Sequence, residues 1–174
     1  MKKLLDKSSL EQIVHAFITS RIDNCNSLLC GVPTSEIHRL QKIQNSAARI
    51  ITGSPRTDHI TPVLNSLHWL PITQRIKYKI LVLVFKCINN MAPQYLQGMI
   101  SAYIPAKGLR SQAKQLLRVP VSTSHREKEQ CFNIIGPTLW NNLPTMMKTC
   151  TSLDKFKRLL KTHLFDEYFN NHHS

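Results

Sequence analysis

The sequence predicts a mostly α-helical protein, a helical bundle with a basic extended connector and room for one short β-strand or hairpin. Two observations carry this prediction. Apolar residues recur at three- and four-residue spacing through several segments, which places them on one face of a helix, and Gly or Pro closes most of these segments. The one stretch that favours a strand, residues 116–121, is short and interrupted by Pro120.

A chain of 174 residues and 20.0 kDa can bury one sizeable core, so we expect one domain with a possible appendage. Three regions are predicted within it. Residues 1–100 form a helical region, residues 101–126 a basic connector without sustained periodicity, and residues 127–174 a C-terminal helical extension. We expect the extension to pack as one unit with residues 1–100.

Two amphipathic helices, together a helical hairpin, are predicted in the first third of the chain. The first spans 10–29 and stops at Gly31 and Pro33. Its apolar face consists of Leu10, Ile13, Val14, Phe17, Ile18, Ile22, Cys25 and Leu29. The second has Ser35 as N-cap and ends before Gly53. Its apolar stripe consists of Ile37, Leu40, Ile43, Ala47, Ala48 and Ile51.

The strongest helix is predicted from Ile72 to Ile88, after a short helical segment over 62–67 and a corner at Trp69 and Pro71. Its apolar face consists of Ile72, Ile76, Ile80, Leu83, Val84, Cys87 and Ile88. Three more apolar residues predict that its second half is buried: Leu81, Val82 and Phe85. Another short helix is expected over 92–100.

The C-terminal extension is predicted to begin with a helix near 129–135. The segment GPTLWNNLP (136–144) then holds Trp140 in a short turn or a single helical segment, because Gly and Pro punctuate it. Ser152 caps the last helix. This helix turns Leu153, Phe156, Leu159, Leu160 and Leu164 inward, and Lys155, Lys157, Arg158 and Lys161 outward.

Positive charge is concentrated in the middle of the chain. The sequence has 23 Lys and Arg against 10 Asp and Glu, a net charge of +13, and residues 59–126 hold nine of the basic residues and no acidic one. Such a field attracts polyanions, and each cation that neutralises a phosphate adds salt-dependent affinity. Nucleic acid is therefore the favoured partner, and a solvated basic surface that serves solubility is the alternative.

Seven basic residues are the candidate nucleic-acid contacts. Arg75, Lys79 and Lys86 recur at offsets of zero, four and eleven in the strongest helix, and we expect them on the face opposite the Ile72, Ile76 and Ile80 stripe. Four more recur every three or four residues in the connector, which could order on a nucleic acid strand. They are Lys107, Arg110, Lys114 and Arg118.

Catalytic and metal chemistry finds little support. Polymerase catalysis needs paired carboxylates that hold two metal ions, and the close acidic pairs stand in charged segments typical of a solvated surface. These pairs are Glu127 with Glu129, and Asp166 with Glu167. Cys25 and Cys30 lack the second close pair of a structural zinc site. We expect no cofactor, no metal site and no small-molecule substrate.

The two tryptophans and two of the histidines are interpreted as structural residues. Trp69 and Trp140 have apolar neighbours, so they are predicted to anchor the core rather than to stack on an unpaired base. His59 and His68 flank the PVLNSL segment without a nucleophile or carboxylate constellation, which favours a structural role over proton transfer.

Compartment follows from the cysteines and from the apolar segments. Five cysteines, odd in number and widely spread, together with a first segment (MKKLLDKSS) that fails as a secretory leader, predict a protein that is intracellular, nuclear or cytoplasmic, and not secreted. The long uncharged window over 87–106 contains Asn, Gln, Gly and Pro residues that lipid would leave unsatisfied. No membrane association is therefore expected.

Several blocks of the sequence, in one order, resemble a known family. They are SRIDNCNSLLCGVP (20–33), RLQKIQNSAARIITG (39–53), HITPVLNSLHWLPITQRIKYKILVLVFKCINNMAPQYL (59–96), GLRS (108–111), IIGPTLWNNLP (134–144) and FKRLLKTHLF (156–165). The sequences of these blocks resemble the region downstream of the catalytic palm in reverse transcriptases of non-LTR (LINE-type) retrotransposons. The match covers most of the chain.

The resemblance implies a thumb-like helical region over 1–100 that grips template RNA and the RNA/DNA primer duplex. In that family the catalytic carboxylates lie upstream, and this sequence has no aromatic-x-Asp-Asp, so no catalytic residue carries over and we expect no polymerase activity from this chain alone. The missing polymerase portion is a further possible partner. Met1 stands just before the first block, which suggests a truncated or degenerate element copy. The alternatives are a helical protein-interaction scaffold and an element product without activity of its own.

Overall fold

The computed structural model covers residues 1–174 and describes residues 6–104, 115–121 and 131–170. The described residues are mostly helical, as predicted, and their only β-structure is one isolated antiparallel bridge between Ala102 and Leu117. Contacts divide the chain into a first unit, residues 1–76 with 165–174, and a second unit, residues 77–164. These units follow spatial contacts, and the three predicted regions remain a prediction about the chain's organisation.

Helical segments follow one another along the whole described chain. Those up to α4 are α1 (Lys7–Val14), the π-helical turn η1 (His15–Thr19), α2 (Ser20–Asp23), the 3₁₀ turn η2 (Asn26–Leu29), α3 (Thr34–Thr52) and α4 (Ile60–Ser66). The later ones are α5 (Ile72–Ile88), α6 (Gln94–Gln97), α8 (Phe132–Asn141), α9 (Thr145–Lys148) and α10 (Leu153–Asn170). Both α5 and α10 contribute residues to each unit.

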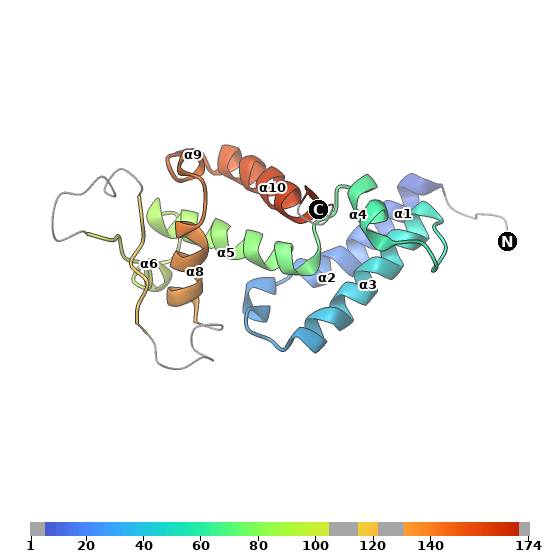
Figure 1. Ribbon diagram of the computed structural model, residues 1–174, viewed down its shortest axis with the longest axis horizontal. Helices are drawn as coiled ribbons and strands as arrows, with labels where there is room; N and C mark the ends of the chain where they lie inside the picture. Colours follow the sequence, from blue (N-terminus) through green and yellow to red (C-terminus); the bar gives the residue numbers. More distant parts are fainter. Residues whose placement is uncertain (1–5, 105–114, 122–130, 171–174) are drawn as a thin grey trace. The chain divides into compact units, whose positions relative to one another are not determined.

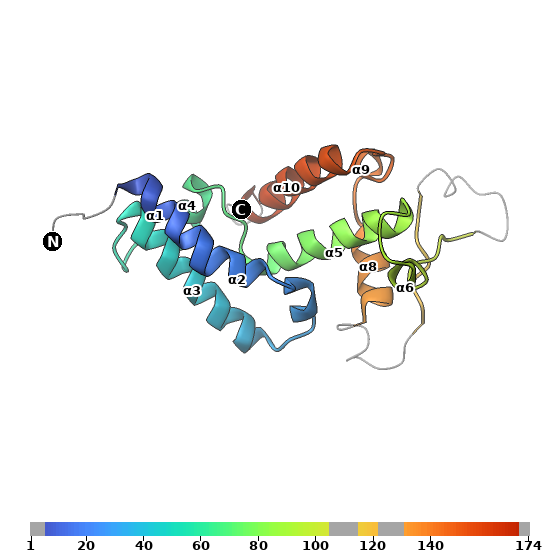
Figure 2. The same ribbon diagram turned by 180° about the vertical axis from the view of Figure 1, so that it is seen from behind.

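The predicted helical hairpin is present in the first unit. The run from α1 to α2 lies beside α3 in both views (Figures 1 and 2), and α1 and η1 contact α3. The first arm ends at Asp23 rather than at residue 29. Asn24 is extended and Cys25 has a left-handed backbone (φ 52°), which breaks the helix before η2.

The apolar stripe predicted for this first arm is wrong at three positions, since Cys25 is exposed as well as Ile13 and Phe17. Val14 is buried, whereas Ile13 is 42% exposed and Phe17 is 75% exposed. A π-helical turn holds more residues than an α-helical turn, so it shifts the side chains within and beyond it around the helix axis. A stripe read at 3.6 residues per turn therefore leaves the buried face within η1, which accounts for Phe17. Ile13 precedes this turn, in α1, and is not explained by it.

The second arm, α3, begins and ends at local signals in the sequence. It begins at Thr34, directly after Pro33, so Ser35 lies in the first turn and not at the predicted N-cap. It ends as predicted at Gly53. The left-handed backbone of this glycine (φ 71°) lets its N–H donate to the Arg49 carbonyl at 2.8 Å.

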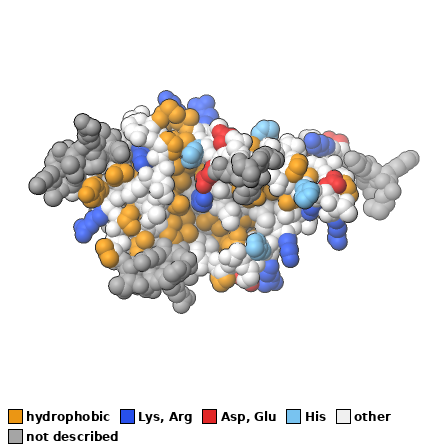
Figure 3. Space-filling view, in the orientation of Figure 1, with side chains coloured by type: hydrophobic (Ala, Val, Ile, Leu, Met, Phe, Trp, Pro, Cys, Tyr) orange, Lys and Arg blue, Asp and Glu red, His pale blue; other side chains and the backbone are white. Residues whose placement is uncertain are grey.

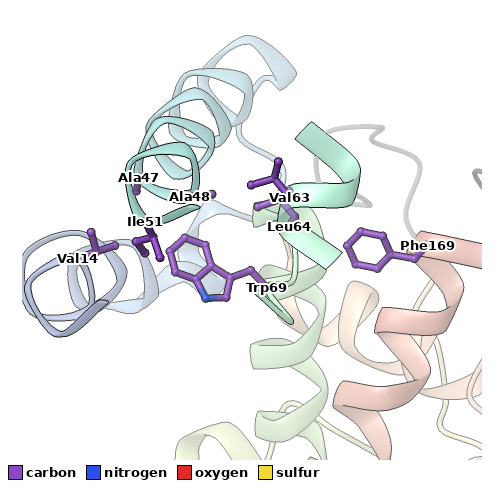
Figure 4. Packing of buried hydrophobic residues seen from close by; sticks show 8 residues of the cluster. All are labelled: Val14, Ala47, Ala48, Ile51, Val63, Leu64, Trp69 and Phe169. Carbon is purple, nitrogen blue, oxygen red and sulfur yellow. The ribbon is translucent and has the colours of Figure 1, made fainter. Parts of the chain in front are cut away.

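A buried cluster around Trp69 forms the core of the first unit (Figure 4). Its members are Val14, Ala47, Ala48, Ile51, Val63, Leu64, Trp69 and Phe169. Figure 4 shows the indole ring with Ile51 on one side and Leu64 on the other. The structure confirms a short helix at this point, α4, and confirms Trp69 as a core residue with 8% of its surface exposed.

Three aromatic rings form the core of the second unit. Phe85 of α5 stacks on Phe156 of α10 with ring centroids 4.4 Å apart, and Trp140 of α8 lies 5.8 Å from Phe156. All three side chains are fully buried. Aromatic pairs at such separations stabilise a core by more than the burial of their apolar area alone. The predicted burial of Trp140 is thus confirmed, as is that of the second half of α5 at Leu81, Val82, Val84 and Phe85. Ile88, also predicted on the apolar face, is 41% exposed at the end of the helix.

Helix α8 runs through a segment where the sequence predicted an interruption. It contains Gly136 and Pro137 in its interior, and both are buried. A proline inside a helix removes one hydrogen bond, so close packing must offset that loss. Gly136 permits this packing, because a Cβ atom at this position would lie 2.8 Å from the Cγ2 methyl of Val84 in α5.

The remaining elements agree with the sequence in kind and differ in length. α6 follows Pro93 and is shorter than the predicted helix over 92–100. α9 was not predicted as a separate element. α10 starts after Ser152, as predicted, and the Ser152 Oγ accepts from the Lys155 N–H at 3.5 Å. Its inward stripe is confirmed, with Phe156, Leu160 and Leu164 buried.

Replacing Gly136 by Ala is expected to destabilise the second unit by about 1–3 kcal/mol, because the new methyl group collides with Val84 inside a packed core. Thermal or urea unfolding followed by circular dichroism measures this change. Gly98→Ala is the matched control, since a Cβ there meets its nearest neighbour only at 3.7 Å. In the double variant Gly136→Ala, Val84→Ala the two losses should be less than additive, and simple additivity would contradict the proposed collision.

Candidate nucleic-acid interface

The excess of positive charge belongs to one unit. By sequence, the second unit holds fourteen Lys and Arg against three Asp and Glu, a net charge of +11. The first unit holds nine against seven, a net charge of +2. Coulomb attraction to a polyanion therefore favours the second unit. In the first unit the number of acidic residues nearly equals the number of basic ones, so the net attraction is small.

On α5, two predicted contacts are available. Lys79 is exposed and Lys86 is half-buried, and no described acidic residue pairs with either. They are seven residues apart, about two helical turns and roughly 10 Å along the axis, so they lie on one side of the helix. The expectation that this side is opposite the isoleucine stripe is wrong. Ile72 and Lys79 are also seven residues apart, so the lysines border the buried face.

The third predicted contact on α5, Arg75, already has a carboxylate partner. Its guanidinium donates from Nη1 to Asp23 Oδ2 at 2.7 Å and Oδ1 at 3.0 Å, and from Nε to the Leu70 carbonyl at 2.9 Å. The Arg75 side chain is only 15% exposed. The structure therefore gives Arg75 a structural role in the first unit, and a phosphate contact by this residue stays a prediction.

Two glutamines of α3 hold the same corner of the chain. Gln44 donates from Nε2 to the Leu70 carbonyl, and the Ile72 N–H donates to Gln41 Oε1, each at 2.9 Å. The second bond satisfies a first-turn N–H of α5 that has no partner within its own helix. Gln44 is consequently buried, whereas Ile43, which the predicted stripe turned inward, is 50% exposed.

This polar cluster, which consists of Asp23, Gln41, Gln44, Leu70, Ile72 and Arg75, joins three of the sequence blocks. Asp23 lies in the block at 20–33, the glutamines in the block at 39–53, and Arg75 in the block at 59–96. In each of these three blocks, residues therefore serve to stabilise the first unit.

Four nucleic-acid contacts were predicted in the connector, and Arg118 is the one that the structure describes. This side chain is exposed, and none of the described acidic residues pairs with it. Lys107, Arg110 and Lys114 lie outside the described residues. The backbone around Arg118 is held in place, because the Asn141 side chain accepts from the Leu117 N–H at 2.8 Å and donates to the Leu117 carbonyl at 2.9 Å.

Helix α10 adds cations that the sequence predicted as outward-facing but not as contacts. Lys155, Arg158 and Lys161 are exposed at three-residue spacing, and none pairs with a described acid, whereas Lys157 pairs with Asp154 at 3.7 Å. The signal that could have found them is this repeated spacing on the polar side of an amphipathic helix. On the face drawn in Figure 3, Lys and Arg side chains stand at separate points rather than in one dense patch.

The remaining candidates have structural surroundings. His68 has a left-handed backbone (φ 53°), and its ring stacks on Phe165 with centroids 5.7 Å apart. His59 is exposed and precedes α4 as its N-cap residue. Burial raises the pKa of the Cys87 thiol, so this core cysteine stays protonated near neutral pH.

Two features are absent from the described part of the chain. No group of three or more His, Cys, Asp or Glu side chains there is placed to hold a metal ion. No described helix combines the length and the apolar character that crossing a bilayer requires. Comparison with protein-family models, with curated proteins and with solved structures finds no match to this chain.

Arg75→Ala is expected to lower the free energy of unfolding by about 1–3 kcal/mol, because it removes the partner of Asp23 and one donor to the Leu70 carbonyl. Lys79→Ala, one turn further along α5, is the control and should change stability by less than about 0.5 kcal/mol. Urea unfolding of both variants measures the difference. Equal effects would mean that the polar cluster does not stabilise the first unit.

Proposed function

We propose that this chain is a non-catalytic, C-terminal region of a non-LTR retrotransposon reverse transcriptase that binds template RNA and the RNA/DNA primer duplex. The family assignment rests on the ordered sequence blocks over residues 20–165. The binding activity rests on the charge of the second unit. Nucleotidyl transfer would be supplied by a polymerase portion, because the sequence contains no paired carboxylates in a polymerase motif.

The observation that carries the binding proposal is the set of exposed cations of the second unit that lack an acidic partner among the described residues. Within the predicted set these are Lys79 and Arg118, with the half-buried Lys86, and α10 adds Lys155, Arg158 and Lys161. Ion pairs with carboxylates would have to be broken before a phosphate binds. Unpaired cations avoid that cost and release counterions from the nucleic acid.

Contacts of this kind position a nucleic acid without reading its sequence. Lysine side chains at separate points can each reach a phosphate, and their affinities add in a salt-dependent way. This suits a region that must hold whatever template and primer the polymerase is copying. The proposed interface is therefore a set of dispersed phosphate contacts on α5, α10 and the connector.

A second candidate function is a helical scaffold that binds protein, and one observation favours it. The first unit exposes large apolar side chains on the run from α1 to η2 and on α3. They are Ile13, Phe17, Leu28, Ile43 and Ile50. Exposed apolar side chains that gather on one surface are typical of sites that contact another chain. The polymerase portion of the same family is the natural partner for it.

Salt dependence and charge reversal distinguish the two functions. Fluorescence anisotropy with a labelled RNA/DNA duplex should give an affinity that falls steeply as salt rises. Lys79→Glu with Lys86→Glu should weaken binding by about tenfold or more and should reduce the slope of log affinity against log salt by roughly 2, since two phosphate contacts are lost.

The matched control reverses two exposed cations of the first unit, Arg21→Glu with Lys42→Glu, which changes the net charge equally. Its affinity should fall much less, because the proposed contacts lie in the second unit. Binding that is insensitive to salt, or equally weakened by both pairs of substitutions, would contradict the proposed interface and favour the protein scaffold.

A further inference from the structure

The second unit contains a groove beside the β-bridge of the connector. It has a volume of about 420 Å³ and is lined by Tyr103, Leu116, Leu117, Arg118, Val119 and Asn141. This volume lies within the range of roughly 300–1,000 Å³ that is usual for small-ligand sites. All the lining residues belong to the second unit, which carries most of the net charge.

The walls of the groove are held by backbone hydrogen bonds. The Tyr103 N–H donates to the Leu116 carbonyl at 2.9 Å, and the Arg118 N–H donates to the Ser101 carbonyl at 2.8 Å. These bonds pair the two extended segments on either side of the Ala102–Leu117 bridge. These bonds fix the backbone on both sides of the groove, so side chains rather than these bonded groups would meet a ligand.

Helix α8 holds the segment over residues 115–118 by side-chain hydrogen bonds. Asn141 uses both its side-chain oxygen and its side-chain nitrogen on the backbone of Leu117, and the Trp140 Nε1–H donates to the Gln115 carbonyl at 3.0 Å. Leu117 is buried in consequence. Since side chains alternate along an extended segment, Leu116 and Arg118 are turned to the side opposite Leu117.

The groove thus combines an aromatic ring, a cation and apolar walls. Tyr103 is 48% exposed, so much of its ring is accessible, and the Arg118 guanidinium is exposed without a described acidic partner. Proteins that bind single-stranded nucleic acid use aromatic rings to stack on bases and basic groups to follow the phosphates. Both tryptophans are buried in cores, so they leave this role to another ring.

We propose that this groove binds an unpaired nucleotide of an RNA or DNA strand, with the base stacked on Tyr103 and its phosphate paired with Arg118. The proposal deepens the proposed nucleic-acid binding and rests on it for the class of ligand. It adds a site for single-stranded nucleic acid to the dispersed contacts that hold the duplex. Arginine suits the phosphate because its planar fork can donate two parallel hydrogen bonds.

The test compares two labelled ligands with the full chain: a blunt RNA/DNA duplex, and the same duplex with a single-stranded RNA extension. The wild-type protein should bind the extended ligand more tightly. Tyr103→Ala should weaken binding of the extended ligand by roughly tenfold, the usual effect of losing one stacked base, and should leave the blunt duplex affinity unchanged. Tyr103→Phe should retain the wild-type preference, because it keeps the stacking ring.

Tyr95→Ala is the matched control, since this tyrosine of α6 is 69% exposed in the same unit and does not line the groove. It should bind both ligands like the wild-type protein. Circular dichroism of each variant checks the fold. Loss of binding in Tyr95→Ala as great as in Tyr103→Ala would overturn the groove, because any exposed tyrosine would then serve.

The remaining outcomes separate the groove from the duplex interface. Tight, salt-dependent binding of the blunt duplex without gain from the extension, or with no effect of Tyr103→Ala, overturns the groove and leaves the proposed function standing. Binding of the extended ligand without binding of the blunt duplex, lost in Tyr103→Ala, supports the groove and overturns the duplex interface. Binding of neither ligand by the wild-type protein overturns both.

Discussion

The Asp23–Arg75 ion pair and the glutamine bonds beside it hold the corner at which α5 begins. The Leu70 carbonyl receives hydrogen bonds from Arg75 and Gln44, and the Ile72 N–H donates to Gln41. This corner directly follows Trp69, the centre of the first hydrophobic cluster. A turn that brings backbone polar groups so close to a core must give them partners, and side chains of α3 and α5 supply them, while Asp23 of α2 holds the Arg75 guanidinium in place.

The second unit is held together mainly by aromatic packing. Phe85 stacks on Phe156 in its core, and Trp140 packs against Phe156 at a tilt. Gly136 lets α8 approach Val84 of α5 closely enough to bury a proline inside a helix. The indole nitrogen of Trp140 is satisfied by a connector carbonyl. The same helix therefore serves two purposes, because its apolar side fills the core and its polar end holds the connector backbone in an extended form.

These constraints divide the basic residues into two kinds. Arg75 belongs to the polar cluster of the first unit, and its carboxylate partner neutralises it. Lys79 and Arg118 have no such partner among the described residues, and neither do Lys155, Arg158 and Lys161 of α10. A cation inside a hydrogen-bonded network supports the fold, whereas a solvated cation can exchange its counterions for a phosphate. The proposed interface depends on this second kind.

Local patterns in the sequence determined the helical class, the span of α5, the end of α3 at Gly53 and the burial of both tryptophans. Only the tertiary structure decided that Gln44 is buried in place of Ile43, that α8 continues through Pro137, and that Arg75 meets Asp23 across 52 residues of sequence. Periodicity reports which face of a helix is apolar, because that depends on neighbours three or four residues away. It carries no information about which distant carbonyl or carboxylate a polar side chain will reach, and that choice separates a structural arginine from one available to a nucleic acid.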